Sequence, residues 1–525
     1  QDFQGPNTTR SLSEIVSPGT YFETETAPES NYVCSIAISQ IDTQVSIGFS
    51  AFDVVSGDVQ VRESMNGKGD ILEEVESCLS VWNPYECLIT TDSVERARDW
   101  VRQLGLTQAK IHLLTPDQDS KLAQLGVNSC KQTFQLETLK TCFPEANDHV
   151  IRQLIFEHEL ATQSLVVLVD FVHSHNRSAL SHVQFPRVGV ARTRVKLGNR
   201  SLRQLNMFSS ALNERGVFDY FNYTITNAGS RSLRNMFANP VSDRSELEER
   251  YGQLEKGLAG DLHKEIRNII RGAGDIGFAS RQLGRNHFPP RKLALLFYDL
   301  KRSEKLMELS PTLFGECTFG FISKWLDERL DIKACLNYSC LAADFTMARD
   351  GEALDPASIF RPGLNKAIDD LKGRLNSKKN ALKKIKDGLQ ELLKSPGGRD
   401  KNETLKIYQT PKSPILIVGT ARRVNIILEK HRSSSTLDKL SALPSPSGKK
   451  DKVITSTKIH RLCSEIADLN HSLSILVRDE YSQVRHWLLK YMDDIRKAGS
   501  VLGLGDRIQS LCYGIVKHNL VRPTL

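Results

Sequence analysis

GVFDYFNYTITNAGSRSLRNMFANPVSDRSELEERYGQL, residues 216–254, is a stretch that predicts two consecutive capped helices. Thr226 is placed to cap the first helix, which begins one residue later. Pro240 ends this helix, because proline cannot continue the hydrogen-bond pattern. Asp243, followed three residues later by Glu246, is a capping-box pattern that starts the second helix. The apolar residues that share a face are Leu233, Met236 and Phe237 in the first helix, and Leu247 and Leu254 in the second.

The same stretch contains two arginines and three aromatic residues. Arg231 and Arg234 stand between the apolar positions of the first helix. We interpret them as a structural pair that braces this helix, with a contact to a neighbouring domain as the alternative. Phe218, Tyr220 and Phe221 are expected to pack in the core.

Composition places the chain among globular proteins. Its 525 residues predict roughly three to four domains. Apolar content of 40% and charged content of 25% are typical of soluble proteins. Ser164–Val172, the most apolar run, is far shorter than the roughly 18 residues that span a bilayer, so no membrane association is expected. The net charge of +8 permits an anionic partner without requiring one.

The ten cysteines are scattered and none has zinc-site spacing, so no metal is predicted. They favour a reducing intracellular compartment, with the nucleus, a mitochondrion, a plastid and the bacterial cytoplasm equally open. His173, His175 and His182 are irregularly spaced and lack acidic or cysteine co-ligands, so we interpret them as surface or core residues. The chain starts at Gln1, so a targeting peptide is neither seen nor excluded.

The first third of the chain predicts a linker and an α/β domain. Residues 1–30 are polar and indicate a linker. Residues 31–148 alternate between strand and helix patterns, which predicts an α/β or α+β domain, and a helix over 149–173 is expected to close it. The expected strands are Tyr32–Ser39, Val45–Val54, Gly57–Glu63, Glu86–Thr90 and Ile111–Leu114, and the expected helices are Ile71–Trp82 and Val94–Leu104.

The remainder, apart from one insert, predicts helices. Residues 149–394 are assigned to a helical core that ends in a long rising helix, and residues 459–525 to a long returning helix that rejoins the core. The expected core helices are Arg200–Leu212, Asn227–Asn239, Ser245–Leu258, Leu262–Ala273, Pro290–Ser303 and Phe319–Asp327.

Two heptad-like segments predict a pair of long helices. The first has its seam at Leu364, Ile368, Leu371, Leu375, Leu382, Ile385, Leu389 and Leu392, with a break at Lys378. The second has its seam at Ile459, Leu462, Ile466, Leu469, Leu473, Leu476, Val484, Leu488, Tyr491 and Ile495, with a break at Glu480. An antiparallel pair about 45 Å long, with the intervening insert at its tip, fits this arrangement. Two ordinary core helices are the alternative.

The insert, residues 395–458, is predicted to be β-rich, with a strand-like run at Ile415–Leu428 and a loop at Ser441–Gly448. Between Arg399 and Lys458 there are thirteen Lys and Arg residues and five Asp and Glu residues, a net charge of +8. We call residues 399–458 the basic tip. Clustered cations of this kind bind the phosphates of a polyanion. The predicted DNA-contacting residues are Arg422, Arg423, Lys430, Arg432, Lys449, Lys450 and Lys452.

Several motifs resemble the MutS family of DNA mismatch-recognition proteins. The family's Thr-x-x-Gly-Ser-Arg-x-Leu helix and the Asp-Arg start of the next helix match Thr226, Gly229, Ser230, Arg231, Leu233, Pro240, Asp243 and Arg244. Further resemblances are Ser17-Pro18-Gly19-Thr20, Val45–Asp58 (with Ser56 where Thr is usual), Asn83-Pro84-Tyr85-Glu86, Leu405–Lys430 and Leu520–Pro523. The clamp segment departs from bacterial members and hints at an organellar or viral branch.

The resemblance implies an RNase H-like connector, a helical core with lever helices, and a clamp that holds duplex DNA, mismatched DNA above all. It also implies a homo- or heterodimer with another MutS-type subunit. The family's Phe-x-Glu mismatch-reading motif and its Walker A loop are not found in this sequence, so the chain is expected to be a fragment or a divergent relative. ATP and Mg²⁺ would then belong to an ATPase domain outside this chain, which itself needs no cofactor.

Two other functions compete with this interpretation. A coiled-coil scaffold with a basic tip would bind RNA or an acidic protein. An RNase H-like nuclease would need several carboxylates that converge on metal ions, and the candidates are Asp53 with Glu73 or Glu74. Asp42 stands in an expected turn and no later Asp completes the set, so we predict no catalytic residue.

Overall fold

The computed structural model describes residues 17, 31–41, 44–104, 109–117, 120–180, 183, 185–186, 195, 199–208, 215–284, 288–337, 356–393, 405–410, 413–432, 440–444 and 451–524. Most of these residues are helical and the strands form two small sheets, which confirms a mainly helical fold class. Within the described ranges no helix is long and apolar enough to cross a membrane. The predicted linker, apart from Ser17, lies outside the described residues.

The chain divides into two compact units. Unit 1 takes in the described residues of Gln1–Asn286, Tyr298–Gly320 and Tyr491–Leu525, and unit 2 those of His287–Phe297 and Phe321–Lys490.

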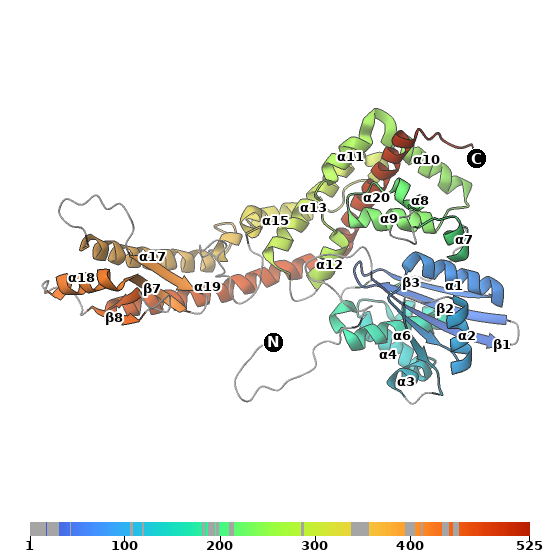
Figure 1. The fold of residues 1–525 in the computed structure, drawn as a ribbon, viewed down its shortest axis with the longest axis horizontal. Coiled ribbons are helices and arrows are strands. Elements are labelled where there is room, and N and C mark those ends of the chain that lie inside the picture. The colour runs from blue at the N-terminus through green and yellow to red at the C-terminus, as the bar shows by residue number, and fades with distance from the viewer. Residues whose placement is uncertain are drawn as a thin grey trace. The chain divides into compact units, whose positions relative to one another are not determined.

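Unit 1 contains a five-stranded sheet with the strand order β3-β2-β1-β4-β5 (Figure 1). The first three strands are antiparallel neighbours, whereas β4 and β5 are added in parallel. This confirms the five predicted strands, although β3 begins later than expected because Ser56-Gly57-Asp58 form a turn. The strands are β1 (Tyr32–Ile41), β2 (Gln44–Asp53), β3 (Val59–Gly67), β4 (Glu86–Thr90) and β5 (Lys110–Leu114).

Helices cover both faces of this sheet. α1 (Lys68–Trp82) and α2 (Val94–Leu104) pack on one face, where Cys34 and Ile36 of β1 belong to their apolar cluster. Val33, directly before Cys34 and so on the opposite side of β1, belongs to the cluster built on α6 (Glu159–His175) at the other face. α6 begins within the helix predicted over 149–173 and supplies the apolar cover of one face of the sheet.

Close approach between α6 and the sheet depends on small side chains. A Cβ atom on Gly48 would stand 1.8 Å from the carbonyl oxygen of Leu160, so only glycine fits beneath the start of α6. The hydroxyls of Ser50 and Ser164 lie 2.8 Å apart, and Ser164 Oγ donates to the carbonyl of Ser35 at 2.7 Å.

The single helix predicted over 149–173 is in fact two, α5 (Asp148–Glu157) and α6, because His158 leaves helical geometry.

α20 (Met492–His518) is the central helix of the helical part of unit 1, packed against α9, α10, α11 and α12 (Figure 1). The two helices predicted from residues 216–254 are confirmed as α9 (Asn227–Ala238) and α10 (Arg244–Leu258). The other helices are α3 (Lys121–Asn128), α4 (Gln132–Cys142), η1 (Arg177–Leu180), α7 (Asn199–Gln204), α8 (Val217–Phe221), η2 (Ala259–Asp261), α11 (Leu262–Ile270), α12 (Ile276–Gly284), α13 (Pro290–Leu309, shared with unit 2) and α14 (Pro311–Phe314).

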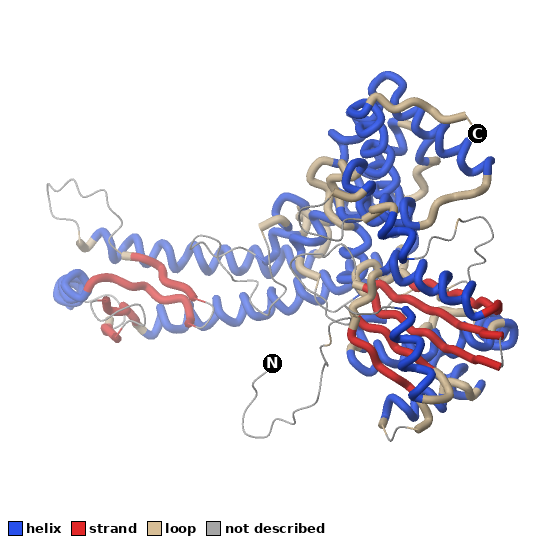
Figure 2. The backbone as a smooth tube through the Cα atoms, turned by 45° about the vertical axis from the view of Figure 1, so that its right-hand side comes forward, coloured by secondary structure: helices blue, strands red, loops and turns tan. Residues whose placement is uncertain are grey.

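Unit 2 is built on two long antiparallel helices, α17 (Lys366–Glu391) and α19 (Thr457–Leu489), which lie side by side in Figures 1 and 2. Asn365 Nδ2 donates to Glu480 Oε2 at 2.9 Å, and Lys378 Nζ lies 2.6 Å from Glu465 Oε2. The residue number falls along one helix as it rises along the other, so the predicted antiparallel arrangement is correct. With a rise of 1.5 Å per residue, α17 is about 40 Å long and α19 about 50 Å long.

The buried seam follows the predicted heptads only in part. Every seventh residue of α17 from Ile368 to Leu389 is buried. On α19 the predicted Leu476 is only half-buried, and the buried positions Leu473, Val477 and Tyr481 follow two steps of four. This extra step of four shifts the heptad frame near the predicted break at Glu480. It also points Tyr481 inward, where its hydroxyl donates to the carbonyl of Phe288 at 2.9 Å.

A small antiparallel sheet and a helix lie at the end of this pair where α17 finishes and α19 begins (Figure 2). The sheet has the order β6-β7-β9-β8, with β6 (Lys406–Thr410), β7 (Ser413–Thr420), β8 (Ser441–Pro444) and β9 (Asp451–Thr455).

The predicted strand at Ile415–Leu428 is wrong beyond Thr420, because α18 (Ala421–Arg432) follows at once. Val424 and Ile427, three residues apart, are fully buried on one face of α18. Ser441–Pro444, predicted as a loop, is strand β8. Unit 2 also holds α15 (Gly320–Arg329), α16 (Ile332–Cys335) and η3 (Pro356–Ile359).

Candidate nucleic-acid interface

The described part of the basic tip exposes cations on α18. Arg422 and Arg423 stand at its start and are exposed, because the neighbouring Val424 takes the buried side of the helix. Lys430 is also exposed, and its Nζ donates to the carbonyl of Leu392 at 2.8 Å. Exposed guanidinium and ammonium groups can meet phosphates without a large desolvation penalty.

The other predicted contact residues are placed less fully. Lys452 lies on β9, half-buried, with Nζ 3.4 Å from Asn425 Oδ1 of α18. Arg432 is the last residue of α18, and its side chain is outside the described set. Lys449 and Lys450 lie outside the described residues altogether. The structure thus brings Arg422, Arg423, Lys430 and Lys452 together on α18 and the strand beneath it, and their contact with DNA stays a prediction.

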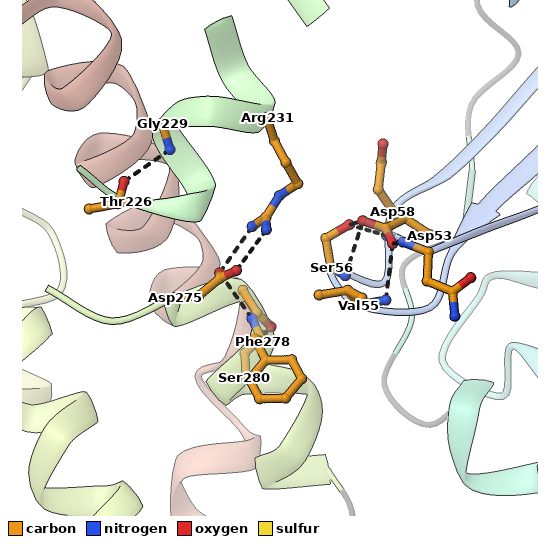
Figure 3. A network of polar contacts seen from close by, with 12 residues as sticks. Asp53, Val55, Ser56, Asp58, Thr226, Gly229, Arg231, Asp275, Phe278 and Ser280 are labelled. Carbon is orange, nitrogen blue, oxygen red and sulfur yellow. Dashed lines mark hydrogen bonds and ion pairs between the residues drawn. The ribbon is translucent and has the colours of Figure 1, made fainter. Parts of the chain in front are cut away.

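The motif positions of residues 216–254 serve the fold of unit 1 instead. Thr226 Oγ1 accepts from Gly229 N at 3.0 Å, which confirms the predicted cap of α9 (Figure 3). The fully buried carboxylate of Asp506, on α20, accepts from Thr226 N at 2.8 Å and from Thr226 Oγ1 at 2.6 Å. A Cβ atom on Gly229 would stand 2.2 Å from Asp506 Oδ2. Gly229 is therefore required by the close passage of α20.

Arg231 joins α9 to the start of α12. Its two terminal nitrogens bind Asp275 at 2.7 and 3.0 Å, and Asp275 Oδ1 accepts from Phe278 N at 3.2 Å (Figure 3). Arg234 lies over the ring of Phe208 at 4.3 Å and the ring of Phe218 at 5.8 Å. The two arginines therefore make separate structural contacts.

Of the three aromatic residues predicted for the core, Phe218 is buried and Phe221 half-buried, whereas Tyr220 is 50% exposed. The prediction is wrong for Tyr220, because the five-residue helix α8 has only one side against the core.

Asp53, the first nuclease candidate, closes a turn. Its carboxylate accepts from Asn31 N at 2.9 Å, Val55 N at 3.0 Å and Ser56 Oγ at 2.6 Å. Burial raises the pKa of Asp53, while these hydrogen bonds and the charge of Arg231 oppose the rise. No group of three or more His, Cys, Asp or Glu residues that could hold a metal is found in the described ranges.

A second pair of motif residues also meets in unit 1. Ser17 Oγ donates to Glu86 Oε2 at 2.7 Å, so the Ser-Pro-Gly-Thr motif is tied to the Asn-Pro-x-Glu motif at the start of β4. Glu86 is fully buried, and His112 Nε2 lies 3.4 Å from its other oxygen. These motifs, like Asp53 and Gly229, have structural roles.

Sequence reasoning missed the carboxylates that hold α9. Asp275 and Asp506 follow Arg231 and Thr226 by 44 and 280 residues, and no local pattern connects them. The sequence offered one sign of this role, which is that Asp506 follows a run of small and apolar residues in α20.

The sequence model described as MutS domain III matches residues 200–512. The DNA mismatch repair protein MutS of Aquifex pyrophilus is 22% identical over 522 residues, which cover 98% of this chain and 54% of that protein. A mutS homolog of Acanthamoeba polyphaga mimivirus is 25% identical over 427 residues, 73% of this chain and 37% of the viral protein. The MutS of Anaplasma phagocytophilum is 23% identical over 394 residues, 73% of this chain and 43% of that protein.

These matches and the capped α9–α10 pair define a mainly helical protein of the MutS type. The chain belongs to the MutS family. It spans about half the length, or less, of the curated relatives named above.

Proposed function

We propose that this chain is the DNA-binding body of a MutS-type mismatch repair protein and that its basic tip clamps duplex DNA. The observation that carries the proposal is the charge distribution: the basic tip has a net charge of +8, equal to that of the whole chain. Its described cations Arg422, Arg423 and Lys430 are exposed on one short helix. Phosphate contacts of this kind hold a duplex without reading its bases.

The architecture supports family roles for the other parts. The order β3-β2-β1-β4-β5, with three antiparallel and two parallel strands, fits an RNase H-like connector. The antiparallel α17 and α19 fit lever helices that transmit the state of the clamp to an ATPase domain, which binds ATP and Mg²⁺ elsewhere in a longer protein. The cysteines among the described residues are free, which fits a reducing intracellular compartment. A partner subunit of the MutS type, identical or different, would complete a ring around the DNA.

The test is the salt dependence of binding to a fluorescent duplex, measured by anisotropy. Each phosphate contact contributes about −0.9 to the slope of log affinity against log salt. Arg422→Gln/Arg423→Gln is therefore expected to flatten the slope by about 1.8 and to weaken binding to all sequences alike. Arg98→Gln/Arg102→Gln, two exposed arginines of α2, is the matched control and is expected to leave the slope unchanged.

Two results would contradict the proposal. One is the absence of duplex binding at low salt by a folded sample. The other is binding that the Arg422/Arg423 variant leaves unaltered. Preference for RNA or an acidic protein over duplex DNA would favour the scaffold alternative.

A further inference from the structure

The outward side of α18 carries more than cations. Val424 and Ile427 are fully buried on the small sheet, so the opposite side of this helix faces outward. Four residues with the spacing i, i+3, i+4 and i+7 share that side, and we call them the outer stripe: Arg422, Asn425, Ile426 and Glu429. Ile426 is half-buried and the other three are exposed.

Cations flank the outer stripe on both sides. Arg423 and Lys430, seven residues or about two turns apart, lie along one edge of it. Lys452 of β9 lies at the other edge, where its Nζ is 3.4 Å from Asn425 Oδ1. A groove of duplex DNA has the matching form, because phosphates line both of its walls and base edges form its floor. The major groove, about 12 Å wide, admits a helix of this kind.

Glu429 is the residue that a purely phosphate-binding surface does not explain. It is exposed, and no described residue forms a hydrogen bond or an ion pair with it. A carboxylate that faces phosphates is repelled by them. The groups on DNA that suit a carboxylate are the amino groups of base edges, the N4 amino group of cytosine above all.

Asn425 is held in an orientation that suits a base edge. The ammonium group of Lys452 is only a donor, so it holds Oδ1 of Asn425 on its side and turns the two donors of Nδ2 away. The second lone pair of Oδ1 stays available. An asparagine amide of this kind forms two hydrogen bonds with adenine, because Nδ2 donates to N7 while Oδ1 accepts from the N6 amino group.

We propose that α18 lies in the major groove of duplex DNA, where Asn425 contacts adenine and Glu429 contacts cytosine. This inference rests on the proposed clamp and adds a preference for base sequence to it, while Arg422 and Arg423 remain phosphate contacts. Asn425 and Glu429 are about 6 Å apart along the helix axis. Since base pairs are spaced by about 3.4 Å, the preferred duplex carries adenine and cytosine within about two base pairs of each other.

The test is selection of duplexes from a randomised pool by the whole chain, followed by sequencing of the bound fraction. The wild type is expected to enrich a short motif that contains adenine and cytosine. Asn425→Ala is expected to lose the adenine preference and Glu429→Gln the cytosine preference. Both side chains are exposed and both new residues favour helices, so both variants are expected to fold. The matched controls, expected to keep both preferences, are Asn376→Ala on α17 and Glu328→Gln on α15, where both side chains are exposed.

A modified base then tests the adenine contact directly. Replacing the selected adenine by 7-deazaadenine removes the N7 acceptor from the major groove and leaves the phosphates unchanged. In fluorescence anisotropy the wild type is expected to bind the modified duplex about tenfold more weakly than the unmodified one. Asn425→Ala is expected to bind the two duplexes equally, which a structural role of Asn425 beside Lys452 would not produce.

The outcomes separate this inference from the clamp. Duplex binding with equal base frequencies in the bound and input pools would overturn the inference and leave the clamp standing. Base preferences that both variants retain would overturn it in the same way. The absence of duplex binding at low salt by a folded sample would overturn both.

Discussion

Gly229→Ala is the substitution that most sharply tests why the α9 motif contains glycine. A Cβ atom at this position would lie 2.2 Å from Oδ2, 2.5 Å from Cγ and 2.6 Å from Cβ of Asp506. The carboxylate belongs to α20 and is fully buried, so it cannot swing into solvent. The substitution must push Asp506 away by about 1 Å to reach ordinary contact distance.

The displacement removes the hydrogen bonds that Asp506 accepts from Thr226 N at 2.8 Å and Thr226 Oγ1 at 2.6 Å. Hydrogen bonds to a charged group contribute about 1.5–3 kcal/mol each, so losing two costs about 3–6 kcal/mol. The better helix propensity of alanine returns about 1 kcal/mol. We therefore expect the free energy of unfolding of unit 1 to fall by about 2–5 kcal/mol.

The assay is urea denaturation followed by circular dichroism, with hydrogen exchange at the amides of Ile225 and Thr226 as a local readout. Gly252→Ala on α10 is the matched control, since no atom lies within 4 Å of its added Cβ. It is expected to stabilise the chain by up to about 1 kcal/mol. A Gly229→Ala protein that unfolds at or above the wild-type urea concentration would refute the reasoning.

Three further predictions concern other polar contacts. Arg231→Gln leaves the buried Asp275 carboxylate without its cation and is expected to cost about 3–5 kcal/mol in urea denaturation, with Arg231→Lys less harmful. Asp299 has a pKa raised to about 6 by burial, so its contribution to stability is full below pH 4 and lost as the pH rises through 6. Relative to Asp299→Asn, the wild type should therefore lose roughly 3 kcal/mol between pH 4 and 7, and equal pH profiles would contradict this. Tyr481→Phe leaves the carbonyl of Phe288 without its 2.9 Å donor and should lower the free energy of unfolding by about 1–3 kcal/mol, whereas an unchanged midpoint would show that the bond contributes nothing.

Local features of the fold could be predicted from the sequence because their causes are local. The cap at Thr226, the stop at Pro240 and the cap at Asp243 all act within four residues, and α9 and α10 have the predicted ends within a residue. Apolar runs bounded by turn residues likewise predicted the strands of the larger sheet, because helices cover both of its faces.

Features that depend on distant partners could not be predicted. The run Ile415–Leu428 is rich in β-branched residues, yet α18 begins at Ala421 because Val424 and Ile427 bury themselves on the small sheet. The heptad count on α19 missed Tyr481, whose inward position depends on the carbonyl of Phe288. For the candidate interface, composition identified the segment and its charge, but not that Lys452 would lie against Asn425 of α18.

Hydrogen exchange of the whole chain with and without duplex DNA tests the clamp most directly. The account predicts slower exchange in the basic tip when duplex is bound, at amides of α18 and β9 above all, and loss of this protection in Arg422→Gln/Arg423→Gln. Duplex binding that protects amides elsewhere in the chain and leaves α18 and β9 unchanged would contradict the account.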